Sequence, residues 1–280
     1  MLSKRVSPAE EKPFSAVPVE TIGGLPIAVI DRAMSARLMS DIARARRNSE
    51  QLPLVVTSAN GQVLSMCAAS ADIRSLFLRA DLIHADGMPI VFASRLLCRA
   101  PLPERVATTD LFHDVAKIAP EYDMRFYMLG ATPAVIAAAV KAARALYPRL
   151  QIVGYRDGYF GPHEERAVVE AIKVARPDIL WLGLGAPVEL AFALRHRDAL
   201  RGVGLIKTAG GLFDFLSGKN RRAPAWMQSV GLEWAYRIWL EPRRLARRYI
   251  MTNPHAIFLL LTQTRRTGIA QGDLVPEQRR

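Results

Sequence analysis

The chain has 280 residues, half of them hydrophobic, and a formal net charge of +12 at pH 7. This length and composition predict one large folded domain, or one domain with an appendage, and exclude a disordered chain. The two cysteines, Cys67 and Cys98, have no zinc-ligand spacing and are too few for a disulfide framework, which favours a reducing compartment.

In chain order, residues 1–17 are polar and contain proline, and we expect a flexible tail without the apolar core of a secretory signal. Residues 18–218 then alternate short apolar runs with helical patterns. The expected strands are 54–57, 82–84, 124–130, 151–155, 179–185 and 204–209, and the clearest helices are 133–146 and 164–175. This alternation predicts an α/β core with a doubly wound, parallel, Rossmann-like sheet.

Residues 219–280 are rich in arginine and aromatic residues and show no obvious strand, so we expect a helical appendage. One helix should cover 226–240, and a second should begin at Pro242 and end near residue 251. Asn253-Pro254 predicts a further break before a last helix at 255–264. No apolar run in the chain reaches the length of a membrane span, which favours a cytoplasmic protein.

The positive charge favours an anionic partner, such as nucleic acid, anionic lipid or a phosphorylated substrate. Much of it lies in residues 221–266, which contain nine arginines, no lysine and two acids. Arginine binds phosphate oxygens through forked hydrogen bonds, so this composition favours phosphate recognition. The alternative, and the more common meaning of a charge run, is a solvated helix face.

Ligands of doubly wound sheets bind beyond the carboxyl ends of the strands, so residues that follow the strands are the candidates for a site. Asp86 directly follows an apolar run, and partial burial there would raise the pKa of its carboxyl and suit it to general-base work. Gly87 leaves space for a substrate. A turn or helix-capping aspartate is the alternative for Asp86, and Asp110 can equally be read as a cap of the helix that follows it.

Gly183-Leu184-Gly185 follows a strand but lacks the third glycine of a dinucleotide fingerprint. The failed match argues against one alternative function, a nucleotide-dependent oxidoreductase, although such glycines can bring backbone N–H groups to a phosphate. No Asp-x-Asp motif and no paired histidines occur, so we expect neither a metal nor another cofactor. The other alternative is a basic protein that binds membranes or nucleic acid, and no nucleic-acid module is recognisable.

The most specific pattern lies near the carboxyl end. It runs through Gly211-Leu-Phe-Asp-Phe-Leu-Ser-Gly218, Arg222-Ala-Pro224, Gly231-Leu-Glu-Trp234, Tyr236-Arg237, Glu241-Pro242 and Arg248-Tyr249. Earlier blocks in matching order are Thr57-x-x-Asn60, Ala85-Asp86-Gly87, Arg105 with Thr109-Asp110, and Gly183-x-Gly185-x-Pro187. From about Thr57 to Tyr249 the chain thus resembles the WecG/TagA/CpsF family of glycosyltransferases, which act in teichoic acid, common antigen and exopolysaccharide assembly.

The resemblance implies an inverting, metal-independent hexosyltransferase that moves a hexose from a UDP-sugar to a polyprenyl-diphosphate-linked glycan during cell-surface polysaccharide biosynthesis. UDP-glucose is the first choice of donor, and UDP-N-acetylmannosamine is the second. The lipid-linked acceptor implies a protein attached peripherally to the inner face of the cell membrane, with no nucleic-acid partner.

The resemblance also assigns residues. Asp86 matches the family's proposed base, and Thr57 matches its partner. Substrate-binding roles fall on Asn60, Gly87, Arg105, Asp110, Gly185, Glu189 and Asp214. Arg237, Arg244 and Arg247 match the arginines that bind the diphosphates and the membrane in the family. Arg248 shares a helical face with Arg244 and Arg247. For Arg237 alone, a surface ion pair with Glu233 is the alternative.

Two positions depart from the family pattern. Thr108 stands where a glycine is usual, and Pro187-Val-Glu189-Leu190 stands where the family usually has Pro-Lys-Gln-Glu. The second departure replaces a Gln–Glu pair thought to contact the donor, so it bears on the identity of the donor sugar and on the role of Glu189.

Overall fold

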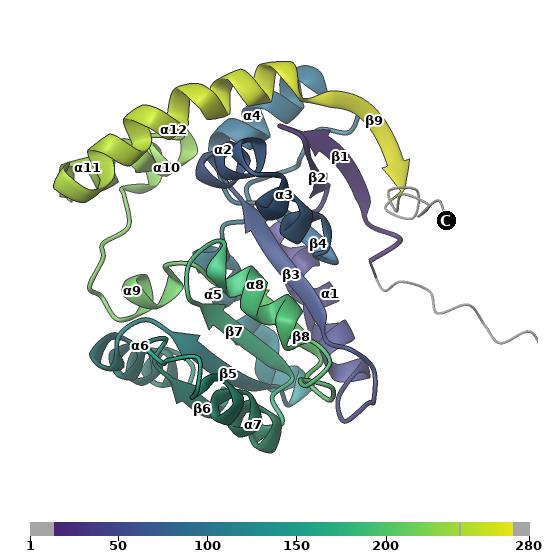
Figure 1. The fold of residues 1–280 in the computed structure, drawn as a ribbon, viewed down its shortest axis with the longest axis vertical. Helices are drawn as coiled ribbons and strands as arrows, with labels where there is room; N and C mark the ends of the chain where they lie inside the picture. Colours follow the sequence, from purple (N-terminus) through teal and green to yellow (C-terminus); the bar gives the residue numbers. More distant parts are fainter. Residues whose placement is uncertain (1–13, 241, 271–280) are drawn as a thin grey trace, which may run out of the picture.

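The computed structural model describes residues 14–240 and 242–270. Six strands form one parallel sheet in the order β4-β3-β8-β7-β5-β6 (Figure 1). Their bounds are β3 Leu54–Ala59, β4 Leu82–Ala85, β5 Arg125–Gly130, β6 Gln151–Arg156, β7 Ile179–Gly183 and β8 Leu205–Thr208. All six match strands that the sequence predicts, and the predicted α/β class with a parallel sheet is confirmed.

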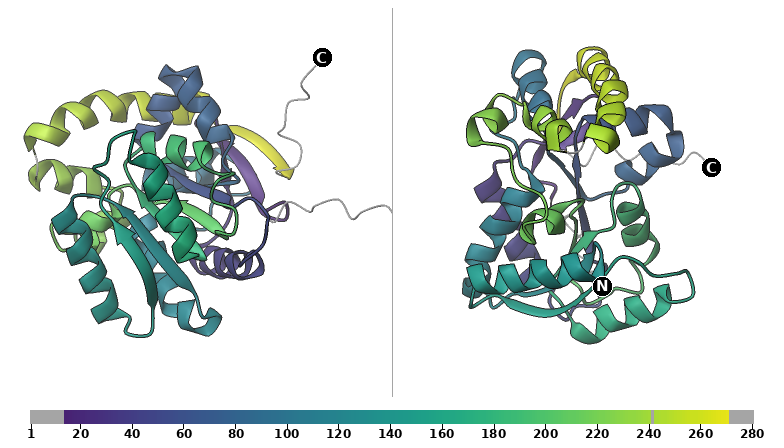
Figure 2. Two further views of the ribbon diagram at one scale, coloured as in Figure 1. Left: turned by 60° about the horizontal axis from the view of Figure 1, so that its bottom comes forward. Right: turned by 90° about the vertical axis from the view of Figure 1, so that its left-hand side faces the viewer.

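Helices cover both faces of this sheet, which is why its strands read as continuous apolar runs (Figure 2). One face packs against α1 Arg32–Ala45, α5 Thr108–Ile118, the short 3₁₀ helix η1 Ala119–Tyr122, α6 Pro133–Leu146 and α9 Leu212–Leu216. The other packs against α2 Gly61–Ala69, α3 Ala71–Leu78, α4 Met88–Leu97, α7 Glu165–Ala175 and α8 Val188–Arg195.

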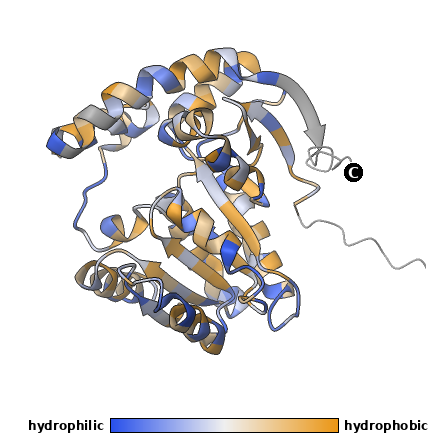
Figure 3. Ribbon diagram, viewed as in Figure 1, coloured by the Kyte–Doolittle hydropathy of each residue, from blue (hydrophilic) through white to orange (hydrophobic). Residues whose placement is uncertain are grey.

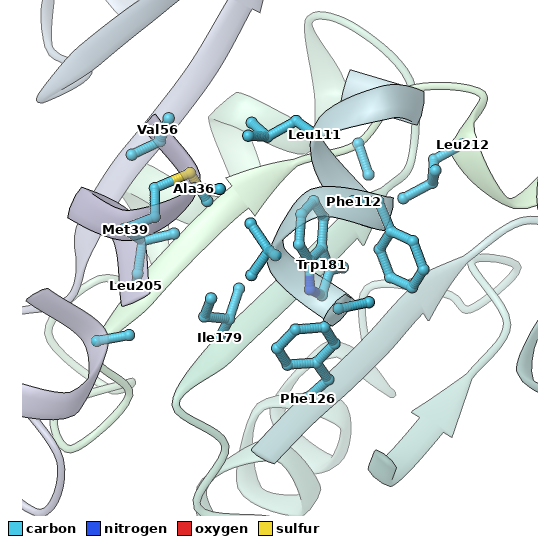
Figure 4. Packing of buried hydrophobic residues seen from close by; sticks show 14 of the residues in the cluster. Ala36, Met39, Val56, Leu111, Phe112, Phe126, Ile179, Trp181, Leu205 and Leu212 are labelled. Atoms are coloured by element: carbon cyan, nitrogen blue, oxygen red, sulfur yellow. The ribbon is translucent and has the colours of Figure 1, made fainter. Parts of the chain in front are cut away.

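Large aromatic side chains fill the core on the α5 side (Figure 4). Trp181 of β7 is fully buried, and its ring meets that of Phe112 of α5 edge-on at 5.0 Å between centroids. Phe126 of β5 completes the group at 5.7 Å from Trp181. Close-packed interiors of this kind are stiff, so the carboxyl ends of the central strands are held in fixed positions.

A second, antiparallel sheet joins the two ends of the described chain, in the order β2-β1-β9. Its strands are β1 Pro18–Ile22, β2 Leu25–Ala28 and β9 Arg265–Ala270. The sequence analysis predicts no strand after residue 218, and the structure differs there. The segment of β9 has no apolar run, so the pairing with β1, and not a local apolar pattern, makes it a strand.

Three helices precede β9: α10 Ala225–Ser229, α11 Glu233–Leu240 and α12 Pro242–Thr262. The single helix predicted over 226–240 is interrupted at Gly231, whose φ of +79° is a left-handed conformation that favours glycine. The break predicted at Asn253-Pro254 is wrong, because α12 continues through Pro254. The hydrogen bond that Pro254 cannot make would use the carbonyl of Ile250, which belongs to an exposed residue.

The last of the carboxyl-terminal helices, α12, packs into the hydrophobic core of the protein. Ala256, Leu259 and Leu260 of α12 are buried, and the two leucines belong to the core cluster on the α2 side of the sheet. Gly61 of α2 gives α12 a close approach, since a Cβ there would lie 3.1 Å from the Cβ of Ala256. The division into a tail at 1–17, a core at 18–218 and an appendage at 219–280 stays a prediction, and residues 1–13 of that tail lie outside the described residues.

Candidate active site

Asp86 lies at the carboxyl end of the parallel sheet, immediately after β4. Its backbone N–H donates to the carbonyl of Ala59 at 2.8 Å, which extends the β3–β4 ladder by one step and fixes where the side chain begins. The residue is half-buried. Within the described residues no hydrogen bond reaches its carboxylate oxygens, so both can accept one from a ligand.

The charges around Asp86 suit a base. Burial raises the pKa of its carboxyl to about 6, while the cations Arg105, Lys207 and Arg237 act in the opposite direction and Glu233 adds to the rise. A pKa near the working pH gives a group that is ionised yet still basic enough to take a proton. The position and the raised pKa are as the sequence predicts, and the catalytic role itself stays a prediction.

Three predicted neighbours of Asp86 lie at the same end of the sheet. Thr57 of β3 is buried, and its hydroxyl lies 2.9 Å from that of Thr208 of β8, which is the contact that its side chain makes. Asn60 caps α2, where its Oδ1 accepts from the N–H of Val63 at 3.1 Å. Gly87 precedes α4 beside Asn60, since a Cβ on Gly87 would lie 3.8 Å from that of Asn60.

A polar cluster joins the loop before α5 to the carboxyl-terminal helices; we call it the arginine cluster and define it as Arg105, Asp110, Arg222, Gln228, Glu233 and Arg237. Arg105 donates to Glu233 at 2.9 Å and to Gln228 at 3.0 Å. Arg222 donates to Asp110 at 2.9 Å. Arg105 and Asp110, both predicted to bind substrate, are thus engaged within the protein and hold α10 and α11 against the core.

The sequence leaves two interpretations open for Arg237, an ion pair with Glu233 and a role at the diphosphate, and the contacts of Arg237 are compatible with both. Its guanidinium lies 3.5 Å from Glu233 one turn earlier in α11, and it stacks over the ring of Phe215 at 4.9 Å. The same charge is close enough to Asp86 to lower the pKa of that carboxyl. Arg244, Arg247 and Arg248 belong to α12, but their side chains lie outside the part of the chain that the structure describes.

Comparison with known proteins agrees with this arrangement. A family model described as "Glycosyl transferase WecG/TagA/CpsF family" matches residues 20–269. The protein belongs to the WecG/TagA/CpsF glycosyltransferase family. This membership makes it a glycosyltransferase, decides against the oxidoreductase alternative, and confirms the resemblance seen in the sequence.

Two relatives are similar over most of their length. The N-acetylglucosaminyldiphosphoundecaprenol N-acetyl-beta-D-mannosaminyltransferase of Bacillus subtilis strain 168 is 31% identical over 201 residues, which is 71% of this chain and 76% of the relative. The protein of the same name from Staphylococcus aureus strain NCTC 8325 is 27% identical over 217 residues, or 78% of this chain and 84% of the relative.

In this WecG/TagA/CpsF protein Glu189, which lies where the sequence differs from the usual family pattern, joins two loops. It lies on α8 with 5% of its surface exposed, and its Oε2 accepts from the N–H groups of Gly185 and Gly210, each at 3.0 Å. Burial raises the pKa of its carboxyl to about 7, against the effect of these two hydrogen bonds and of Lys207. Glu189 therefore ties the loop after β7 to the loop after β8, and its contact with a donor stays a prediction.

Two glycines at these strand ends have different surroundings: Gly130 is tightly packed, and Gly185 faces open space. Gly130, at the end of β5, could not carry a side chain, because a Cβ would lie 2.1 Å from the carbonyl oxygen of Gly183. Gly185 has a φ of +82° and no atom within 4 Å of its Cβ position, so its backbone faces open space. A ligand can approach the chain closely there, as the predicted substrate-binding role requires.

Asp214 borders a cleft next to the arginine cluster. It lies on α9, and its Oδ1 accepts from Lys219 Nζ at 2.9 Å. The cleft has a volume of about 360 Å³ and is lined by Gly218, Lys219, Asn220, Arg221 and Leu240. The carboxylate of Asp214 offsets the charge of Lys219, so Arg221 is the lining cation without an ion pair among the described residues, and the substrate role of Asp214 stays a prediction.

Sequence reasoning missed one functional candidate, Lys207 of β8. Its side chain is fully buried at the end of the sheet, and its Nζ donates to Ser58 Oγ at 2.8 Å, to the carbonyl of Thr208 at 3.0 Å and to Thr108 Oγ1 at 3.3 Å. The available signal was a single lysine inside an apolar run that predicts a strand buried on both faces. Thr108, where the family usually has a glycine, supplies one of the three acceptors.

Proposed function

We propose that the protein transfers a hexose from a UDP-sugar to a polyprenyl-diphosphate-linked glycan, with inversion at the anomeric carbon. The observation that carries this proposal is the carboxylate of Asp86. It accepts no hydrogen bond from a described residue, and its pKa is affected by the cations Arg105, Lys207 and Arg237. Such a site combines a proton acceptor with positive charge for a departing diphosphate. The relatives' names, which specify a diphosphoundecaprenol acceptor, support the choice of acceptor.

The reaction uses these groups in a single displacement. The acceptor hydroxyl forms a bond to the anomeric carbon as the bond from that carbon to the UDP oxygen breaks. The hydroxyl proton passes to Asp86, and the bonding electrons leave with the diphosphate. General-base assistance of this type contributes about 10²–10⁴-fold to a rate. The leaving diphosphate requires electrostatic stabilisation, which we assign to Arg237 and to the cations of the 360 Å³ cleft.

We predict that transfer is retained in excess EDTA, because protein cations and not a metal neutralise the diphosphate. Among the described residues there is no group of three histidine, cysteine or acidic side chains that could hold a metal ion, and the EDTA experiment tests the expectation itself. Initial transfer rates with and without EDTA should agree within about two-fold. Loss of transfer in EDTA with recovery on adding Mg²⁺ or Mn²⁺ would contradict the prediction.

The proposed membrane-facing surface is formed by exposed apolar side chains of α4, α11 and α12, namely Phe92, Leu96, Trp239, Leu240, Ile250, Met251, Ile257, Phe258 and Leu261. The apolar colour predominates in the part of α12 nearest β9 (Figure 3). None of the described helices has both the length and the hydropathy to cross a bilayer. We therefore propose peripheral attachment to the inner face of the cell membrane, with the arginines of α12 near anionic headgroups.

Arg237→Ala is expected to separate catalysis from membrane binding. If Arg237 stabilises the leaving group, the variant should lose about 10-fold or more in turnover with a short, water-soluble acceptor, and Arg237→Lys should recover part of that loss. Trp239→Ser, which alters a side chain 76% exposed, is the matched variant: it should weaken binding to anionic liposomes and spare the soluble assay. Unchanged turnover of Arg237→Ala in the soluble assay would assign Arg237 to structure alone.

The substrates can be identified directly. We would assay a panel of UDP-sugars with a synthetic polyprenyl-diphosphate N-acetylglucosamine, beginning with UDP-glucose and UDP-N-acetylmannosamine. Transfer from one UDP-sugar to the lipid-linked acceptor, with an inverted linkage by NMR, is the expected result. Transfer from no UDP-sugar, or product with retained configuration, would overturn the proposed reaction.

A further inference from the structure

Lys207 is the one buried lysine among the described residues, and a buried ammonium group is unfavourable unless something compensates it. Its three N–H donors have three acceptors, Ser58 Oγ, Thr108 Oγ1 and the Thr208 carbonyl. All three acceptors are neutral, and no carboxylate of the described residues lies within ion-pair distance of the Nζ. The hydrogen bonds therefore fix the position of the ammonium without cancelling its charge.

Strand pairing places Lys207 and Asp86 on the same face of the sheet: the Lys207 Nζ bonds to Ser58 of β3, Ser58 is paired with His84 of β4, and Asp86 follows His84 by two residues. Burial lowers the pKa of Lys207 to about 8, while Asp86 after β4 and Glu189 on α8 act to raise it. His84 of β4 responds as well: burial and then the Lys207 charge hold the pKa of its imidazole well below the usual range. The ammonium thus remains charged at neutral pH, beside one imidazole that is neutral and two carboxyl groups.

Asp86 receives opposite effects from several elements. Arg105 has the largest lowering effect on its pKa, followed by Lys207 and Arg237, whereas Glu233 raises it. Arg105 shares its charge with Glu233 and Asp110, and Arg237 pairs with Glu233. Lys207 has no such carboxylate partner and is shielded from water, so its field at Asp86 is the least neutralised of the three.

We propose that Lys207 is a positioning residue of the transfer reaction: its buried ammonium, tethered by Ser58, Thr108 and Thr208, keeps the Asp86 carboxylate in the anionic form that accepts the substrate proton. This role rests on the proposed function of Asp86 as the base. Lys207 itself gains and loses no proton in the reaction, and it does not contact the reacting atoms.

The proposal predicts the direction in which the pH profile moves. The Asp86 carboxyl must be ionised to act, so activity falls as the pH drops through its pKa of about 6. Removal of the Lys207 charge raises that pKa, and the acid limb of the profile moves to higher pH. One nearby charge typically shifts a pKa by about one unit or more, so Lys207→Met should lose roughly five-fold or more at pH 6 and recover above pH 8.

The first test measures kcat/KM against pH for the parent, for Lys207→Met and for Lys173→Met. Lys173 lies on α7, pairs with Glu170 at the surface and serves as the control, since its loss should leave the profile unchanged. An acid limb displaced upward only in Lys207→Met supports the proposal. An unshifted limb, or a loss that is equal at every pH, would overturn it and leave Lys207 as a structural residue.

Two less disruptive substitutions test the proposal if Lys207→Met fails to fold. Thr108→Val and Ser58→Ala each remove one neutral acceptor and keep the charge. Loosening the ammonium should move the acid limb in the same direction by less than the full charge deletion. If folded Thr108→Val and Ser58→Ala proteins both keep the parental profile, the tether has no catalytic consequence.

A second readout is independent of transfer activity. The chain contains seven lysines, so ¹³Cε-lysine labelling gives a small set of NMR signals in which Lys207 should titrate near pH 8. In Asp86→Asn that titration should move to lower pH, because the carboxylate that raises it is gone. No movement would refute the coupling. If the coupling is present but Asp86→Asn retains turnover, the proposed base is wrong while the electrostatic link stands.

Discussion

Asp86→Asn should lower the turnover number by about 10²–10⁴-fold, which is the usual contribution of a general base. The substitution keeps the volume of the side chain and removes its ability to accept a proton. No described residue donates a hydrogen bond to this carboxylate, so the fold should not depend on it. The measurement is the transfer rate at saturating substrates, together with calorimetric binding of UDP.

The control for this prediction is Asp72→Asn. Asp72 is an exposed carboxylate in the first turn of α3. The same chemical change there should leave turnover within about two-fold of the parent. If Asp86→Asn also remained within a few-fold of the parent while binding UDP, Asp86 would be a residue that only ends β4, and another group would have to take the proton.

Removal of residues 219–280 should yield a protein that does not fold stably. The alternating pattern is complete before residue 218 and by itself predicts a stable truncated core, but the structure gives a different expectation. The truncation would expose the face of α2 that α12 covers and leave β1 without β9. The expected result is insoluble protein, or a melting temperature lowered by tens of degrees, measured by thermal unfolding of any soluble fraction.

A point substitution tests the same claim with less disruption. Leu259 of α12 is 1% exposed within the core cluster, so Leu259→Ala should destabilise the protein by about 2–5 kcal/mol. Leu261, two residues later, is 62% exposed, and Leu261→Ala should change the free energy of unfolding by less than about 0.5 kcal/mol. Equal effects of the two substitutions would show that α12 does not contribute to the core.

Much of the parallel sheet can be predicted from the sequence because each strand carries its own local signal. A run such as Ile179–Gly183 is apolar throughout, and it is bounded by residues that end strands. The strand β9 lacks such a signal, because it is a strand through pairing with β1 from the other end of the chain, whereas β1 also pairs locally with β2. Local rules also misplace breaks: Pro254 lies within α12, while Gly231 interrupts a predicted helix.

The site divides in the same way. The strand-end rule locates Asp86, Asn60 and Gly185 without any knowledge of contacts, because that rule follows from parallel-sheet geometry. It cannot show that Arg105 pairs with Glu233, 128 residues later in the chain. Nor can it show that Glu189 joins two loops. The role of Lys207 could not be inferred from its place in an apolar run, because its three oxygen partners come from three elements that only the fold brings together.

The antiparallel pairing of β1 with β9 has a consequence for biosynthesis. The edge of β1 is formed early on the ribosome, but its partner is among the last described segments to be translated. At about 5–20 residues per second, the nascent chain would wait tens of seconds between the two events. During that interval all six strands of the parallel sheet have been synthesised, but the face of α2 that α12 covers and the edge of β1 that β9 pairs with stay open until α12 and β9 leave the exit tunnel. The proposed membrane-facing surface is thus completed only as synthesis ends, which limits the time in which its apolar side chains could contact other nascent chains.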